Sequence, residues 1–224
     1  MTGTPHDDRF DASPRQKRPA EAEIDSSTTG DDPSRRSPAQ LDTSSLIEAG
    51  RSTLLVVDVQ ERFVPAMHEI EPVVANIERL ARAAGLFDIP IVASEQVPQK
   101  LGPTLPSLAE LLPPSVAKSK FSAAELLGGP PQDHSRETER PQVVLCGIET
   151  HVCILQTAVE LAERDRLPVV VVDATTSRTP ASHAAALARL QQLGVTLATT
   201  EMVLFEWLRD AAHPAFREVS RLIR

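Results

Sequence analysis

Short apolar runs alternate with amphipathic segments along most of this chain, and this alternation restricts its fold more than any other feature. The runs are rich in Val, Leu and Ile and only a few residues long, which is typical of strands buried in a parallel sheet. The segments between them repeat apolar residues at helical spacing. Strands are predicted at residues 53–57, 90–94, 116–118, 143–146, 169–172 and 195–198, and helices at 73–87, 107–112, 152–166, 180–193, 202–208 and 214–222. This order predicts an α/β protein, a three-layer α/β/α sandwich with a mainly parallel, Rossmann-like sheet.

The first part of the chain differs from the rest in composition. Residues 1–44 are rich in Pro, Ser, Thr, Asp and Arg and contain almost no apolar side chains. Such a segment cannot bury enough surface to offset the entropy lost on ordering, so it is predicted to be a disordered tail. The folded domain is expected over residues 45–224, with a loop at 128–140 that contains Gly-Gly-Pro-Pro.

Charge and cysteine content argue against several classes of protein. The 224 residues carry a formal net charge of −8 and no basic stripe, which disfavours nucleic acid and anionic membranes as partners. No apolar stretch is long enough to span a bilayer. The only cysteines are Cys146 and Cys153. Without a signal peptide both are expected to be reduced, in a cytoplasmic protein.

Three chemically useful residues fall where predicted strands end, and parallel strands present these ends at one edge of the sheet, where ligands bind. Cys153 follows the strand at 143–146 and begins a helix, whose N-terminal N–H groups and dipole favour a thiolate. Asp58 ends the first strand and could accept the thiol proton. Lys118 ends the short third strand, where its charge could hold the other two groups in ionised form.

Each of these residues also has a purely structural interpretation. Cys153 could be a buried cysteine packed under the sheet. Asp58 could cap a turn, and Lys118 could be solvated, which is the interpretation preferred for Lys120. The joint placement of all three at strand ends favours the catalytic hypothesis over the separate structural ones.

Three motifs in this order resemble the isochorismatase-like cysteine hydrolases. They are Leu-Val-Val-Asp-Val-Gln-Glu-Arg-Phe at 55–63, Lys-Ser-Lys-Phe-Ser-Ala at 118–123 and Cys-Gly-Ile-Glu-Thr-His-Val-Cys at 146–153. The resemblance extends from residue 53 to the C-terminus. Shorter matches at 95–96, 101–104, 173–178 and 204–216 resemble the branch called isochorismatase domain-containing proteins.

The resemblance implies the isochorismatase-like hydrolase fold and a catalytic triad of Asp58, Lys118 and Cys153. It also implies a non-proline cis peptide between Ile148 and Glu149. That turn would direct the N–H groups of Glu149 and Cys153 at an oxyanion. A homo-oligomer is a further implication of the family.

The region after the second strand departs from the metal-binding relatives. Nicotinamidases of this fold carry histidine ligands there, whereas residues 94–100 contain no histidine, and the six histidines of the chain show no paired ligand spacing. No metal and no other cofactor are therefore expected. The prediction is a metal-independent cysteine hydrolase that acts on a small amide or related C–N acyl substrate through a thioester. The alternatives are a catalytically idle binding or scaffold protein and a hydrolase of isochorismate-type vinyl ethers.

Four further residues are candidates for the walls of the substrate pocket: Gln60, Phe63, Gln96 and Phe121. Gln60 could instead orient Asp58 or cap a turn, and the two phenylalanines could equally belong to the core. His151 is interpreted as a structural residue hydrogen-bonded at the start of its helix.

Overall fold

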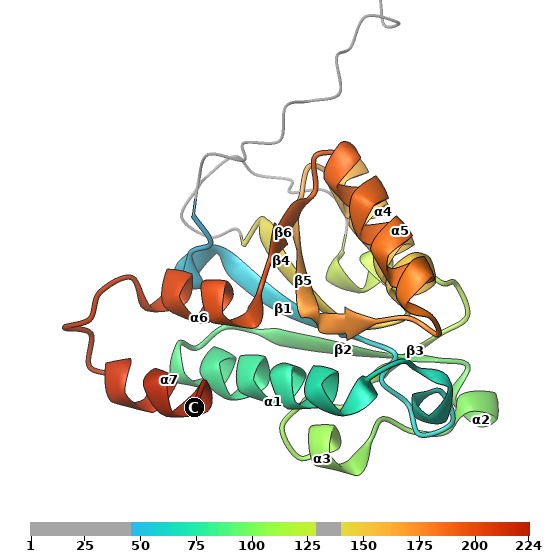
Figure 1. The fold of residues 1–224 in the computed structure, drawn as a ribbon, viewed down its shortest axis with the longest axis horizontal. Coiled ribbons are helices and arrows are strands. Elements are labelled where there is room, and N and C mark those ends of the chain that lie inside the picture. Colours follow the sequence, from blue (N-terminus) through green and yellow to red (C-terminus); the bar gives the residue numbers. More distant parts are fainter. Residues whose placement is uncertain (1–45, 129–139) are drawn as a thin grey trace, which may run out of the picture. The chain divides into compact units, whose positions relative to one another are not determined.

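A computed structural model describes residues 46–128 and 140–224, and its centre is a six-stranded parallel sheet (Figure 1). The spatial order is β3-β2-β1-β4-β5-β6. The strands are β1 (Ser52–Val57), β2 (Ile91–Gln96), β3 (Val116–Lys118), β4 (Gln142–Ile148), β5 (Leu167–Thr176) and β6 (Thr196–Ala198). All six predicted strands are present, and the predicted α/β sandwich is confirmed. The predicted tail at 1–44 and nearly all of the predicted 128–140 loop lie outside the described residues.

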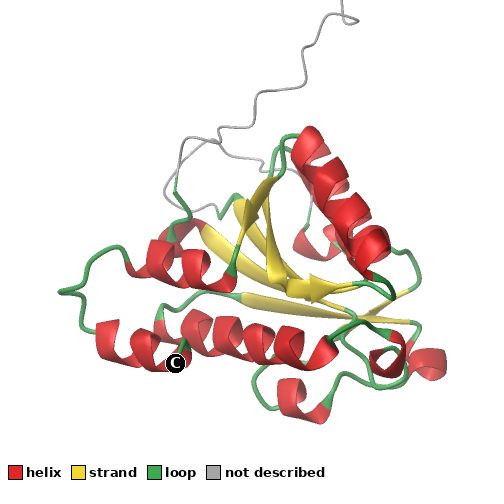
Figure 2. Ribbon diagram, viewed as in Figure 1, coloured by secondary structure: helices red, strands yellow, loops and turns green. Residues whose placement is uncertain are grey.

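Helices cover both faces of the sheet, as Figure 2 shows. They are α1 (Ile70–Leu86), α2 (Pro98–Leu101), α3 (Pro106–Ala109), α4 (Leu155–Glu163), α5 (Pro180–Gln192), α6 (Thr200–Leu208) and α7 (Phe216–Leu222). Successive side chains of β1 pack against the helices on opposite faces of the sheet, because side chains alternate across a strand. Leu54 and Val56 pack with α1, α3, α6 and α7, while Leu55 and Val57 pack with α4 and α5. No described helix is long and apolar enough to cross a membrane.

Two predicted boundaries are wrong for identifiable reasons. The strand predicted to stop before Asp173 continues to Thr176, because a shift in the β4–β5 register after Leu145 lets pairing resume. The Asp173 carboxylate accepts hydrogen bonds from the N–H and hydroxyl of Thr200, at 2.7 and 2.9 Å, and so ties β5 to the start of α6. The helix predicted at 152–166 is divided: a π-helical turn, η5 (Thr150–Ile154), precedes α4.

Gly147 allows β1 and β4 to approach closely at the end that carries the site. Its φ of 117° lies in the region that favours glycine, and it pairs in register with Val57. A Cβ built on Gly147 would lie 2.2 Å from the carbonyl oxygen of Val57 and 2.7 Å from its nitrogen. Because both atoms are backbone in a central strand, no side-chain movement could relieve the contact.

We expect Gly147→Ala to lower the free energy of unfolding by about 3 kcal/mol or more, since the positive φ and the overpacking each cost about 1–3 kcal/mol. Gly85→Ala is the matched control, because Gly85 is exposed in α1 with nothing within 4 Å of its added Cβ. It should raise stability by about 0.5–1 kcal/mol. Urea unfolding followed by the fluorescence of the single tryptophan, Trp207, measures both. Equal midpoints for the two variants would contradict this account of Gly147.

Candidate active site

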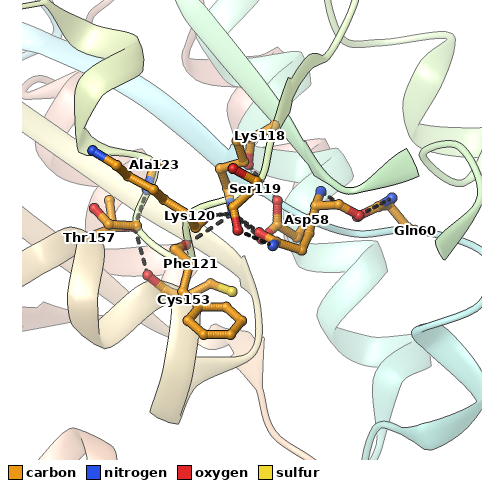
Figure 3. Close-up of polar contacts among 12 residues, drawn as sticks. Asp58, Gln60, Lys118, Ser119, Lys120, Phe121, Ala123, Cys153 and Thr157 are labelled. Carbon is orange, nitrogen blue, oxygen red and sulfur yellow. Dashed lines mark hydrogen bonds and ion pairs between the residues drawn. The ribbon is translucent and has the colours of Figure 1, made fainter. Parts of the chain in front are cut away.

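The three strand-end residues meet at the carboxyl edge of the sheet, at the point where the strand order reverses between β1 and β4 (Figure 3). Asp58 follows β1, Lys118 ends β3, and Cys153 lies in η5 just after β4. Open parallel sheets bind ligands at such a reversal, because the loops that leave it diverge. The topology therefore brings together residues that are 35 to 95 positions apart in the sequence.

Asp58 and Lys118 form a buried ion pair. The Lys118 ammonium donates to Oδ2 of Asp58 at 2.7 Å, and the two side chains are 7% and 0% exposed respectively. The Ser94 hydroxyl donates to Oδ1 at 2.8 Å, so both carboxylate oxygens have partners. Asp58 also has a φ of 55°, and its N–H donates to the Ser94 carbonyl. The carboxylate is thus fixed from both its side chain and its backbone.

The Lys118 ammonium donates to other acceptors besides its ion-pair partner. Besides Asp58, its ammonium donates to Oε1 of Gln96 at 2.7 Å and to the carbonyls of Phe121 and Lys120 at 2.9 and 3.1 Å. A buried ammonium needs such a shell, because the charge has lost its water. Lys120 itself is exposed to solvent, as the sequence interpretation stated, and it pairs with the exposed Glu125.

Gln60 and Gln96 belong to a hydrogen-bond network that supports Lys118. The Gln60 amide donates to the carbonyls of Gln96 and Gly102, at 3.2 and 2.6 Å, and accepts from the Gln96 N–H at 2.8 Å. The Gln96 amide in turn donates to the carbonyl of Ser119 at 2.7 Å, so its oxygen is aimed at Lys118. The polar groups of Gln60 are therefore occupied by backbone, which favours an orienting role over substrate contact.

Cys153 is a buried thiol beside the Asp58 carboxylate. Burial, and next the negative charge of Asp58, raise the pKa of Cys153 to about 12, against the opposing effect of Lys118. Burial likewise raises the pKa of Asp58, although Lys118, Ser94 and the Cys153 thiol all donate to its ionised form. The sequence favoured a thiolate at this helix start, but burial and the charge of Asp58 shift the pKa of the thiol in the opposite direction, against the effect of Lys118.

The turn before Cys153 directs one backbone N–H at the sulfur. The Ile148–Glu149 peptide bond is cis. A hydrogen bond from the Glu149 backbone stabilises the ionised form of Cys153 and opposes the rise in its pKa. The Glu149 carboxylate is buried and accepts from Nε of Arg178 at 2.6 Å. An N–H donor so close to the thiol is suitably placed for charge that develops on a bound carbonyl.

The two predicted pocket phenylalanines differ in exposure. Phe63 is partly buried and packs against the core that contains α1. Phe121 is 52% exposed, and Figure 3 shows its ring on the same side of its segment as Cys153. Phe121 is therefore the better placed of the two for contact with a substrate.

Sequence reasoning gave no role to two hydroxyls of the site. Ser94 was only the last residue of the strand predicted at 90–94, and Thr157 was only part of the helix predicted at 152–166. The Thr157 hydroxyl donates to the Cys153 carbonyl at 2.6 Å and accepts from the Ala123 N–H at 2.9 Å. Its position one helical turn after Cys153 is the signal that could have identified it. His151 bonds through Nδ1 to the hydroxyl of Ser177 at 3.0 Å, which agrees with a structural role.

No group of three or more His, Cys, Asp or Glu side chains suited to a metal ion occurs within the described ranges 46–128 and 140–224. Cys146 and Cys153 are both free and buried in the structure. The chemistry that the described site offers is therefore a thiol, a carboxylate that can take its proton, an ammonium that holds the carboxylate, and a backbone donor.

Comparisons with known proteins agree with the motif-based resemblance. The isochorismatase domain model matches residues 52–202. Isochorismatase domain-containing protein 2 of Danio rerio is 42% identical over 174 residues, which cover 77% of this chain and 86% of that protein. The 2A protein of Mus musculus is 39% identical over 173 residues, covering 77% and 82%. Among solved structures, the MAR1 ribonuclease of Caenorhabditis elegans has a TM-score of 0.72 at 36% identity, covering 80% of this chain and 92% of that one.

Removing the charge of Lys118 should destabilise the fold, because Asp58 would remain buried without its counterion. We expect Lys118→Met to cost about 3–5 kcal/mol of unfolding free energy, the usual effect of breaking a buried ion pair. Lys120→Met, two residues away, removes an exposed pair and should leave the urea midpoint unchanged. If both variants unfolded at the wild-type urea concentration, the buried pair would not be stabilising the fold as described.

Proposed function

Because the chain belongs to the isochorismatase family, we propose that it is a hydrolase, and more specifically a metal-independent cysteine hydrolase of small amides or related C–N acyl compounds. The observation that carries the proposal is the contact between a buried thiol and a buried carboxylate that is held by Lys118. Cys153 is the nucleophile, Asp58 the general base and acid, and Lys118 the group that keeps the carboxylate ionised and oriented.

The proposed reaction begins with proton transfer from Sγ of Cys153 to the Asp58 carboxylate as the sulfur attacks the acyl carbon. The carbonyl oxygen gains the negative charge and accepts from the N–H groups of Glu149 and Cys153. The C–N bond then breaks, the nitrogen leaves with the proton from Asp58, and a thioester remains on Cys153. Water attacks the thioester while Asp58 takes its proton, and the acid is released with the thiol restored.

The two raised pKa values suit a cysteine that is activated only during the reaction. A thiol with a pKa of about 12 is almost fully protonated at neutral pH, so it needs a base in direct contact. A carboxylate whose pKa is raised by burial is a stronger base than one in water. The Asp58–Lys118 ion pair supplies that base without exposing it to solvent.

Other functions of the fold make different predictions for Cys153. A scaffold protein would contain a thiol without turnover, and a vinyl ether hydrolase would act without the cysteine. The C. elegans neighbour is named a ribonuclease, so RNA belongs among the substrates tested, although the net charge of −8 disfavours a polyanion. The small-molecule substrate, the homo-oligomer and the cytoplasmic location remain predictions.

Replacing Cys153 should abolish turnover. Against a panel of small amides with isochorismate and RNA included, we expect Cys153→Ala to lower kcat at least about 10³-fold, as for other nucleophile deletions. The wild type should show an acyl adduct on Cys153 by mass spectrometry. Cys146→Ala is the control, because this cysteine is buried within β4 and has no contact with the Asp58 carboxylate. Turnover that survives the loss of Cys153 would contradict the proposal and favour the vinyl ether alternative.

The fall of kcat/KM at low pH should report the protonation of Asp58. A protonated carboxyl cannot accept the thiol proton, so kcat/KM should fall as the pH drops through the pKa of Asp58, which burial raises above its ordinary value. We therefore expect this fall at a pH clearly above about 4, where a solvated aspartate titrates. Circular dichroism over the same range controls for unfolding. A rate that stays constant down to about pH 4 would remove Asp58 from the role of base.

A further inference from the structure

Lys118 and Cys153 lie on two separate segments of the chain, and one buried hydroxyl is hydrogen-bonded to both segments. The first segment runs from Lys118 to Ala123, and the second is the η5 turn with Cys153. Thr157, in α4, donates to the Cys153 carbonyl at 2.6 Å and accepts from the Ala123 N–H at 2.9 Å. Figure 3 shows both contacts as dashed lines that meet at Thr157.

The two hydrogen bonds of Thr157 are shielded from solvent, and together they use both the donor and the acceptor function of its hydroxyl. Thr157 is 0% exposed and Ala123 1% exposed, so neither bond can be replaced by bulk water. A threonine hydroxyl has one proton to donate and lone pairs to accept with, and this arrangement uses both functions. The neighbouring Ser122 adds a second hydrogen bond to the same helix, since its hydroxyl donates to the partly exposed carboxylate of Glu160 at 2.9 Å.

The position of Ala123 matters for the charge of the site. The carbonyls of Lys120 and Phe121, which accept from the Lys118 ammonium, lie between Lys118 and the anchor at Ala123. If that anchor is lost, the described hydrogen bond from Ser122 to Glu160 alone ties this segment to α4, so the two carbonyls are held less firmly relative to η5. The ammonium, which also holds Asp58, would then lose its set position relative to the Cys153 sulfur.

We propose that Thr157 is a positioning residue that sets the Lys118 segment against the Cys153 turn, an inference that rests on the proposed function above. It touches no reacting atom and acts through Ala123 and the Cys153 carbonyl. Its methyl group is buried with the rest of the side chain, whereas its hydroxyl makes the two hydrogen bonds. The two parts of the side chain can therefore be separated by substitution.

The test compares Thr157→Val, which keeps the shape and loses the hydroxyl, with Thr157→Ser, which keeps the hydroxyl. Acrylamide serves as the probe because it is a small amide that adds to a thiol: Sγ bonds to its terminal carbon and the thiol proton ends on the carbon beside the carbonyl. Peptide mass spectrometry of the full-length protein gives the rate at Cys153, with Cys146 as the internal reference for loss of fold.

We expect the valine variant to react about 10- to 100-fold more slowly at Cys153 than wild type, the usual effect of misplacing reacting groups by about 1 Å. The serine variant should stay within about threefold of wild type, because its hydroxyl keeps both hydrogen bonds. Thr200→Val controls for the loss of a buried hydroxyl elsewhere, since Thr200 bonds to Asp173 at the start of α6. It should lower stability and leave the Cys153 rate unchanged. Thr157→Ala repeats the comparison if the valine variant does not fold.

A valine variant that reacts as fast as the serine variant overturns the inference. Turnover of the small-amide panel by Cys153→Ala shows which idea has failed. If that turnover survives, the proposed function fails, whatever Thr157 does. If Cys153→Ala is inactive and Thr157→Val reacts normally with acrylamide, the assignment of the nucleophile stands and only the positioning role of Thr157 is removed.

Discussion

The Asp58–Lys118 ion pair is the interaction on which the rest of the site depends. Two opposite charges, 7% exposed or less, meet at 2.7 Å at the edge of a sheet whose centre is apolar. Removing these charges from water costs several kcal/mol for each ion unless the remaining lone pairs and protons find partners. Ser94, Gln96 and the carbonyls of the segment after Lys118 are those partners. The hydrogen bonds around the site are therefore needed because one pair of charges is buried.

The sheet topology makes that burial possible. The strand order brings β1 next to β4, and Gly147 lets the two backbones approach where a side chain would collide with Val57. The same approach places the carboxylate that follows β1 beside the thiol that follows β4. A site of this kind thus needs no long loops to assemble it, because the ends of neighbouring parallel strands already converge.

The sequence was most informative where periodicity and strand ends determine position. Alternating apolar runs predicted all six strands, and their ends predicted that Asp58, Lys118 and Cys153 would lie together. Exact boundaries were missed where tertiary contacts decide them: β5 continues past Asp173 because its register shifts, and η5 widens before α4. The hydrogen-bond partners of Gln60, Gln96 and Thr157 could not be predicted, because they are mostly backbone groups that only the fold brings near.

The protonation state of Cys153 shows why local sequence context alone misleads. A cysteine at the start of a helix is expected to ionise easily, and the nearby lysine strengthens that expectation. Lys118 does lower the pKa of Cys153, yet burial and the Asp58 charge together raise it to about 12. Reactivity in such a site depends on moving one proton between two buried groups. The relative positions of the sulfur, the carboxylate and the ammonium therefore matter more than the acidity of the free thiol.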